Sequence, residues 1–248
     1  MLHRYDWSET SLVVELFTRE RGRVVVAAKG AKRPTSQLRP VLLPFQRLAV
    51  QLGRPPADPA AELRTLRSAE WAGRGPPLAA AALFAGFYLN ELLLKLLARD
   101  DDHPRLFDLY ADTLAALADE QPALRAFELV LLRELGVLPE LALETPTQAP
   151  LGAAARYALH PEAGLVAAAG TETPALQGRQ WGALEEALVV ALASGEARAL
   201  RAACAAPTGA LRGALRNVVQ YHLGSTPLRT RLVMQDVQRL VDPPALRR

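Results

Sequence analysis

The sequence has few of the residues that disulfides and metal sites need. Its 248 residues include one cysteine, Cys204, which excludes a disulfide within the chain and a cysteine-based zinc site. A single cysteine fits a reducing compartment, and the alanines around it predict a small buried residue. The histidines are spread along the chain without the paired spacing of metal ligands, at His3, His103, His160 and His222. We therefore expect no metal and no cofactor.

Long apolar runs are also missing. The most membrane-like stretch, residues 78–89, has 12 uncharged residues before Asn90 and Glu91, whereas a bilayer span needs about 20. We interpret it as a buried helix. Polar and charged residues follow Met1 almost directly, so we expect no signal peptide and a cytoplasmic location.

Motifs for catalysis are absent as well. Residues 29–32 lack the spaced glycines and the Gly-Lys-Ser/Thr ending of a phosphate-binding loop. There is no Gly-x-Ser-x-Gly elbow for a nucleophilic serine. The acidic clusters at 100–102 and 185–186 are typical of solvated loops and helix faces. We predict no catalytic residues and a protein that is not an enzyme; nucleotide hydrolysis by the pure protein would revive the enzyme alternative.

Positive charge is concentrated near the N-terminus. Residues 1–78 contain 13 Lys and Arg against 7 Asp and Glu, a net charge of +6, whereas residues 79–248 have a net charge of −3. A basic segment of this kind indicates a polyanionic partner. The alternative is an arginine-rich solvated surface, since the chain has 26 arginines and only three lysines.

Two structural regions are predicted, separated by the Gly- and Pro-rich residues 73–77. Before them, β-branched and alternating apolar runs predict a small β-barrel with strands at 12–18, 24–28, 48–52 and 63–66. After them, apolar residues recur at helical spacing. Helices are expected at 79–99, 106–118, 122–135, 181–193, 197–203 and 209–223. Residues 139–178 form an irregular insert with short strands at 157–160 and 164–166, and a short basic tail begins at Gly224.

The densest positive charge lies between Arg19 and Arg47, where eight Lys and Arg accompany one acid, Glu20. Residues 29–36 follow a predicted strand directly, so we expect a loop at the barrel mouth. Gly30 would allow a phosphate close to the backbone, and cations there would bind DNA without reading its sequence. The predicted DNA contacts are Arg19, Arg21, Arg23, Lys29, Lys32, Arg33 and Arg39. Tyr5, Trp7, Phe17 and Phe45 offer stacking faces, although core packing is the commoner role.

The helix expected at 122–135 combines an apolar stripe with two arginines, Arg125 and Arg133. An arginine beside an apolar groove can capture the carboxylate of a hydrophobic peptide. The pattern alone favours the other interpretation, a core helix with its arginines on the solvated face.

An ordered series of short motifs resembles the RecO family of bacterial recombination mediators. The motifs include WSETSL at 7–12, AKGA at 28–31, LRSAE at 66–70, YLNEL at 88–92, RAFEL at 125–129 and YHLG at 221–224. Further matches are at 17–18, 22–23, 43–45, 178–180, 227–228 and Arg231. The resemblance extends over nearly the whole chain.

The resemblance implies an α+β protein with an OB-fold β-barrel at residues 1–75 and a helical domain at 76–248. It also implies binding of single- and double-stranded DNA, annealing of complementary strands, and loading of RecA with RecR onto DNA coated with single-strand-binding protein (SSB). The Lys29 loop would face DNA in the bacterial nucleoid. Arg125 with Leu129 would receive the acidic, Phe-ended SSB tail.

Two departures from the family pattern matter. Some relatives have a four-cysteine zinc site in the insert, and this chain resembles the zinc-free branch. The family usually has several more residues before Leu2, so we expect a shortened first barrel strand. The alternative function is a protein-interaction scaffold with little direct DNA binding.

Overall fold

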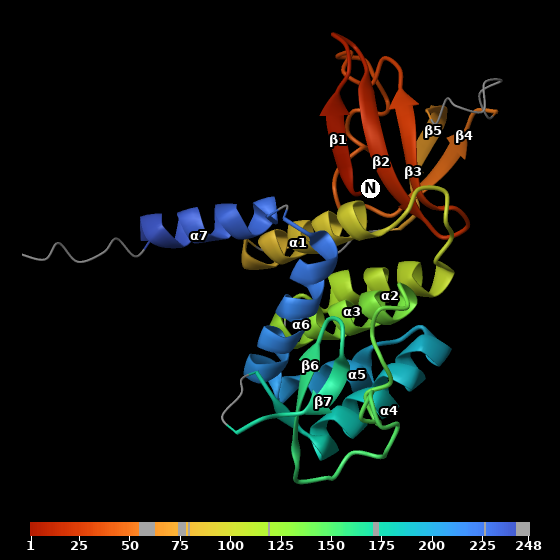
Figure 1. Cartoon of the computed structure of the whole chain (residues 1–248). Coiled ribbons are helices and arrows are strands. Elements are labelled where there is room, and N and C mark those ends of the chain that lie inside the picture. The colour runs from red at the N-terminus through yellow and green to blue at the C-terminus, as the bar shows by residue number, and fades with distance from the viewer. Residues whose placement is uncertain are drawn as a thin grey trace, which may run out of the picture. The chain divides into compact units, whose positions relative to one another are not determined.

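The computed structural model describes residues 1–54, 63–73, 78, 80–118, 120–170, 174–225 and 227–241 (Figure 1). The chain divides into two compact units. Unit 1 comprises residues 1–79 and 90–107, and unit 2 comprises residues 80–89 and 108–248. The predicted boundary at 73–77 falls mostly outside the described residues.

Unit 1 contains a five-stranded sheet with an OB-like strand order, and the predicted α+β class is confirmed. The order is β1-β2-β3-β5-β4, with β3 and β5 parallel and the other neighbours antiparallel. The strands are β1 (His3–Asp6), β2 (Leu12–Thr18), β3 (Gly22–Ala28), β4 (Leu48–Leu52) and β5 (Arg64–Trp71). The first three predicted strands are confirmed, and the predicted fourth is longer than expected.

The sheet is not a closed barrel, because no ladder joins β1 to β4 within the described residues. Two backbone contacts bring the ends of the sheet together just before β4. The Phe45 amide donates to the Met1 carbonyl at 3.2 Å, and the Met1 amine donates to the Gln46 carbonyl at 3.2 Å. The family resemblance implied a shortened first strand, but the residue pattern did not place β1, whose side chains are all exposed. Backbone pairing with β2 holds it instead, with His3 opposite Glu15.

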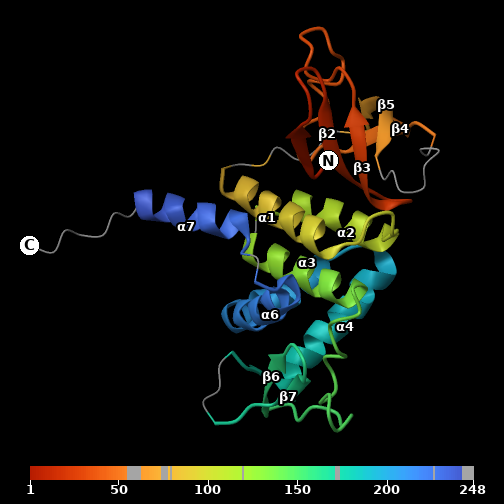
Figure 2. The ribbon, with the colours of Figure 1, turned by 45° about the horizontal axis from the view of Figure 1, so that its top comes forward.

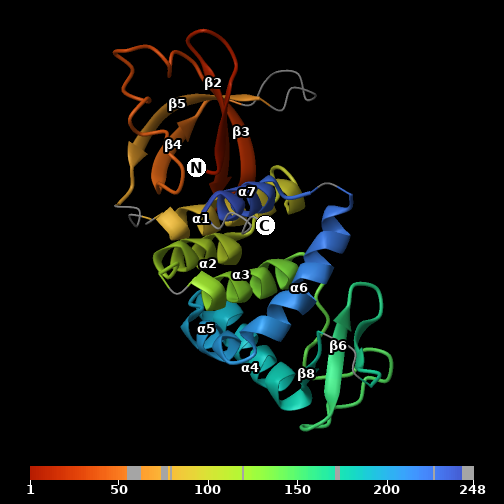
Figure 3. The ribbon, with the colours of Figure 1, turned by 90° about the vertical axis from the view of Figure 1, so that its left-hand side faces the viewer.

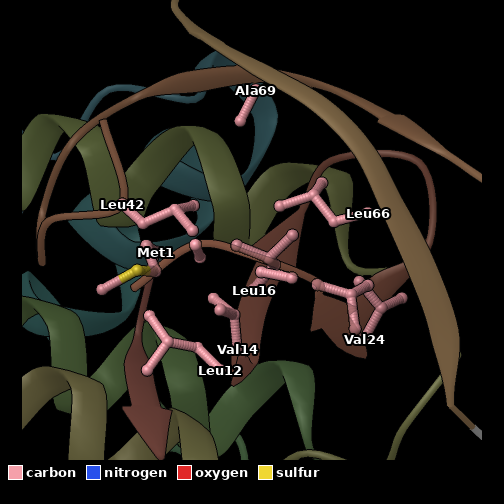
Figure 4. Close-up of a cluster of buried hydrophobic side chains, with 11 residues drawn as sticks. Met1, Leu12, Val14, Leu16, Val24, Leu42, Leu66 and Ala69 are labelled. Atoms are coloured by element: carbon pink, nitrogen blue, oxygen red, sulfur yellow. The ribbon is translucent and has the colours of Figure 1, made fainter. Parts of the chain in front are cut away.

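The core of unit 1 lies on one face of the sheet. Alternate residues of β2 and β3 point inward, as the period of two requires. They meet residues from β5 and from the loop before β4 (Figure 4). The cluster includes Met1, Leu12, Val14, Leu16, Val24, Val26, Leu42, Leu66 and Ala69. The other face of β2 is also covered, because Glu15 and Phe17 are buried. These packed strands form the buried core of the unit.

Unit 2 is mainly helical, and the predicted helices are confirmed with small shifts at their ends. The predicted helices are α1 (Ala80–Leu96), α2 (Pro104–Ala115), α3 (Glu120–Glu134), α4 (Gly178–Ser194), α5 (Arg198–Ala205) and α6 (Thr208–Leu223), and α7 (Arg229–Val241) follows them. α1 and α2 contribute residues to both units. The buried helix α3 packs against α4, α5 and α6 (Figure 2). α7 was not predicted, because the segment reads as a short basic tail.

The predicted insert contains a three-stranded sheet with the order β7-β6-β8. Its strands are β6 (Arg156–His160), β7 (Gly164–Ala167) and β8 (Leu176–Gln177), so both expected short strands are confirmed. β6 packs beside α6 (Figure 3). Cys204 is fully buried, as expected. Among the described residues, no helix combines the length and apolarity of a membrane span.

The turn between β2 and β3 depends on Gly22, whose φ of 59° lies in the left-handed region. A Cβ on Gly22 would overlap the carbonyl oxygen of Asp101. We expect Gly22→Ala to lower the free energy of unfolding by at least about 2 kcal/mol, from strain and overlap together. Gly30→Ala is the control. Its φ of 70° is similarly left-handed, but an added Cβ would lie 3.6 Å from the nearest atom, in the Arg33 side chain. Chemical denaturation showing equal losses for both variants would contradict the overlap.

Candidate nucleic-acid interface

The predicted basic stretch is divided between the two ends of β3. Arg19 and Arg21 lie in the turn before the strand, and Lys29 follows it directly. Seven residues of extended chain separate these ends by about 20 Å. Arg33 and Arg39 lie in the loop after β3, so they belong to the Lys29 end. The structure therefore brings together only part of the predicted set.

At the turn end, the cationic side chains already have partners. Arg21 forms an ion pair with Asp100 at 3.3 Å. The half-buried Arg23 pairs with Glu15 at 3.4 Å, and its Nε donates to the carbonyl of Leu97 at 3.2 Å. A phosphate at this end would have to compete with these carboxylates.

At the other end, two loops hold each other in place. The Gly30 amide donates to the Ser11 hydroxyl at 3.3 Å, and the Lys32 amide donates to the Thr10 carbonyl at 2.9 Å. Ala31 between them is fully buried, which anchors the basic loop to the core. The loop after β3 is thus fixed against the loop between β1 and β2.

The cationic side chains of this loop differ in whether they form ion pairs. Lys29, Arg33 and Arg39 are exposed, and within the described part of the chain none of them forms an ion pair. Lys32 is half-buried and pairs with Asp6 at 3.1 Å, while its Nζ also donates to a backbone carbonyl. Lys32 therefore contributes to the loop's structure, and the other three present unneutralised positive charge to solvent.

A cleft of about 390 Å³ opens beside this loop. It is lined by Arg4, Tyr5, Asp6, Leu12, Ala31, Lys32 and Arg39. Three of these side chains are cationic and one is acidic. Arg4 was not among the predicted contacts, because it precedes the basic stretch in sequence. Pairing of β1 with β2 brings it there, and its guanidinium donates to the carbonyl of Leu42 at 3.1 Å.

The aromatic residues near the basic stretch separate into two groups. Phe17 and Phe45 are buried, so core packing is confirmed for them. It is wrong for Tyr5 and Trp7, which are 48% and 51% exposed. Trp71 on β5, not considered from the sequence, is 60% exposed. Exposed rings of this size provide faces on which bases can stack.

The residues predicted to receive a peptide lie inside unit 2. Leu129 is fully buried, and Arg125 is only 6% exposed. Arg125 pairs with the buried carboxylate of Glu128 at 2.7 Å, and the Tyr88 hydroxyl donates to the same carboxylate at 2.5 Å. The core-helix interpretation of α3 is therefore confirmed. The expected position of its arginines on a solvated face is not confirmed, because Arg125 is buried and Arg133 is half-buried and paired with Glu185.

The buried cluster of Tyr88, Arg125 and Glu128 contains polar atoms that form no hydrogen bond within the described residues. Among the described residues, the Nε of Arg125 and the Oε2 of Glu128 have no hydrogen-bond partner. Burial raises the pKa of Glu128 above its ordinary value, and Arg125 and the Tyr88 hydrogen bond oppose that shift. Burial and the nearby carboxylate also raise the pKa of Tyr88. Buried polar atoms without partners are rare and call for an explanation in packing or in function.

The raised pKa of Glu128 gives a pH dependence with a defined sign. Between its ordinary pKa and its raised value, the folded state binds more protons than the unfolded state, so stability falls as pH rises through that window. We expect the wild type to lose stability relative to Glu128→Gln as pH increases above 4.5, the ordinary pKa of a glutamate side chain. Denaturation of both proteins at several pH values measures this difference. A stability difference between the two proteins that does not change with pH would contradict the raised pKa of Glu128.

The fold and the site together define a class of protein. This is an α+β protein whose OB-like sheet presents a cationic loop with exposed aromatic rings, joined to a helical unit. Among the described residues, no group of three or more His, Cys, Asp and Glu side chains is placed to hold a metal.

Comparison with known proteins then identifies the family. Residues 1–74 match the family described as recombination protein O N terminal, and residues 79–232 match recombination protein O C terminal. A DNA repair protein RecO of Verminephrobacter eiseniae is 51% identical, over 97% of this chain and 95% of its own length. A protein of the same name from Acidovorax ebreus is 50% identical, with the same coverage. The chain belongs to the RecO family of DNA repair proteins.

Proposed function

We propose that this protein is a recombination mediator that binds single- and double-stranded DNA and anneals complementary strands. With RecR it would help to load RecA onto SSB-coated single strands. The observation that supports DNA binding is the group of exposed cations Lys29, Arg33 and Arg39, which form no ion pair within the described ranges and lie beside a cationic cleft. No bond is made or broken in this mechanism, and a DNA partner would place the protein in the cytoplasm, at the nucleoid.

The proposed contact is electrostatic first and then aromatic. Guanidinium and ammonium groups replace the counterions of the phosphates, which gives affinity without sequence preference. Tyr5 and Trp7 then offer stacking faces for unpaired bases, which favours single strands. Arg19, Arg21, Arg23 and Lys32 stay in the proposal as secondary contacts.

The second part of the proposal is capture of the acidic, Phe-ended SSB tail by Arg125 and Leu129. The unsatisfied Nε of Arg125 supports it, because that N–H can donate to an incoming carboxylate. Leu129 adds apolar surface one helical turn away. Both side chains are buried in unit 2, so the tail would enter by local displacement of their neighbours. The partnership with RecR and RecA rests on family membership.

Reversal of the exposed loop charges tests DNA binding. We expect Lys29→Glu together with Arg33→Glu to weaken single-strand binding. The slope of log affinity against log salt should become shallower by about 0.7 for each phosphate that the protein no longer neutralises. Fluorescence anisotropy with a labelled single strand, repeated at several salt concentrations, measures both effects.

A matched control separates local contact from overall charge. Arg54→Glu with Arg67→Glu changes the charge of the same unit equally, at two other exposed positions. Equal effects of the two double variants would refute the loop assignment. Absence of any mobility shift by the wild type at low salt would favour the alternative, a protein-interaction scaffold.

The peptide site is best tested by Arg125→Lys, because a charge-reversing substitution would leave Glu128 uncompensated. Lysine keeps the positive charge but loses the planar fork that holds a carboxylate. We expect weaker binding of an acidic, Phe-ended peptide in calorimetric titration, with DNA binding retained. Arg133→Lys is the control on the same helix, because Arg133 pairs with Glu185. Equal peptide affinity for both variants would exclude the site.

A further inference from the structure

Unit 2 has its own group of arginines that form no ion pair in the part of the chain that the structure describes. Arg212 and Arg216 are exposed on α6, and Arg231 is partly exposed near the start of α7. None of these three forms an ion pair within the described residues. Other arginines of the unit, such as Arg133 and Arg201, are paired with carboxylates. The three therefore differ from these paired arginines, in a region whose net charge is negative.

Helix geometry places two of these arginines on one face. Arg212 and Arg216 are four residues apart, so they project from the same side of α6 with a rise of about 6 Å between them. α6 contains no acidic residue, and none occurs in the first turn of α7. α6 leads directly to the connection with α7 (Figure 3). No carboxylate of α6, or of the first turn of α7, is available to neutralise the pair.

Arg231 lies within electrostatic reach of both α6 arginines. Partial burial lowers the pKa of its guanidinium, and the charges of Arg216 and Arg212 lower it further, while Tyr88 and Glu128 oppose the shift. Glu128 is buried and already holds Arg125. The three arginines therefore repel one another, and binding of an anion at the surface would relieve that repulsion.

The exposed face of α6 around Arg212 and Arg216 has a polar or small character, whereas α7 exposes Leu232, Val233 and Met234 just after Arg231. Gly209 and Asn217 are exposed on α6, and Gln220 is partly exposed. A peptide that ends in an aromatic residue needs an apolar pocket, which these side chains do not supply. The phosphates of one DNA strand follow each other at about 3.4 Å along the helix axis, so two guanidinium groups about 6 Å apart can engage one strand. Arginine is suited to phosphate, since its planar fork donates two parallel hydrogen bonds.

We propose that Arg212, Arg216 and Arg231 form a second phosphate-binding surface, on unit 2, which holds the backbone of a nucleic-acid strand. The inference rests on the proposed DNA-binding function and adds a contact that the Lys29 loop does not include. Two separate surfaces would let one protein hold two strands, which annealing requires.

The test compares two double variants of the full chain. Arg212→Glu with Arg216→Glu should make the salt slope of single-strand binding shallower by about 1.4, because two phosphates are no longer neutralised, and reduce affinity on the order of tenfold. Annealing of complementary strands should slow in parallel. The control is Arg179→Glu with Arg198→Glu, which makes the same charge change at exposed positions of the same unit. Circular dichroism melting checks the fold, and Arg212→Gln with Arg216→Gln replaces the test variant if reversal unfolds it.

Each outcome decides between defined alternatives. Weaker binding confined to the α6 variant supports the surface, and equal behaviour of the α6 variant and the control overturns it. If the α6 variant keeps full DNA affinity but loses affinity for an acidic peptide, the surface receives a protein and the inference is wrong. If the wild type itself binds no DNA, the proposed function fails together with the inference. Failure of the inference alone leaves wild-type binding and its dependence on Lys29 and Arg33 intact.

Discussion

The pairing of β2 with β3 is the constraint on which the cationic site depends. Its register places Leu12 opposite Ala28 at one end and Thr18 opposite Gly22 at the other. This pairing sends Lys29 and the loop after it to the same end of the sheet as the loop between β1 and β2. Hydrogen bonds then join these two loops, among them the bond from the Gly30 amide to the Ser11 hydroxyl. A one-residue slip would move the core-facing side chains of the slipped strand to the opposite face of the sheet.

Ion pairing divides the arginines of this chain into two kinds. Some are structural, such as Arg23 beside Glu15 and Arg133 beside Glu185. Others, such as Arg212, are exposed and form no ion pair among the described residues. A buried pair is a weak source of stability, because desolvation offsets most of the attraction. The pairs seen here therefore matter mainly because they remove cations from the surface that a polyanion can reach.

Much of the fold could be predicted because hydrophobic periodicity is local. The runs that became β2, β3 and α3 bury their apolar residues with the expected periods of two and 3.6. The elements that were missed lack such a signal. β1 has exposed side chains throughout and is held by backbone pairing, and α7 follows a stretch that reads as a basic tail. Trp7 was expected to be buried by its residue type, and the exposed loop that contains it decided otherwise.

The sequence by itself determined the α+β class, the RecO resemblance and the presence of a basic segment after a strand, since composition, motifs and periodicity are properties of neighbours along the chain. Only the tertiary structure decided which cationic side chains form ion pairs and which do not. Arg21 meets Asp100 across 79 residues of sequence, and Arg4 reaches the cleft through strand pairing. Electrostatic neutralisation depends on distances in space. The continuous basic stretch is therefore divided into an end whose arginines form ion pairs, at Arg21 and Arg23, and an end with exposed cations, at Lys29 and Arg33.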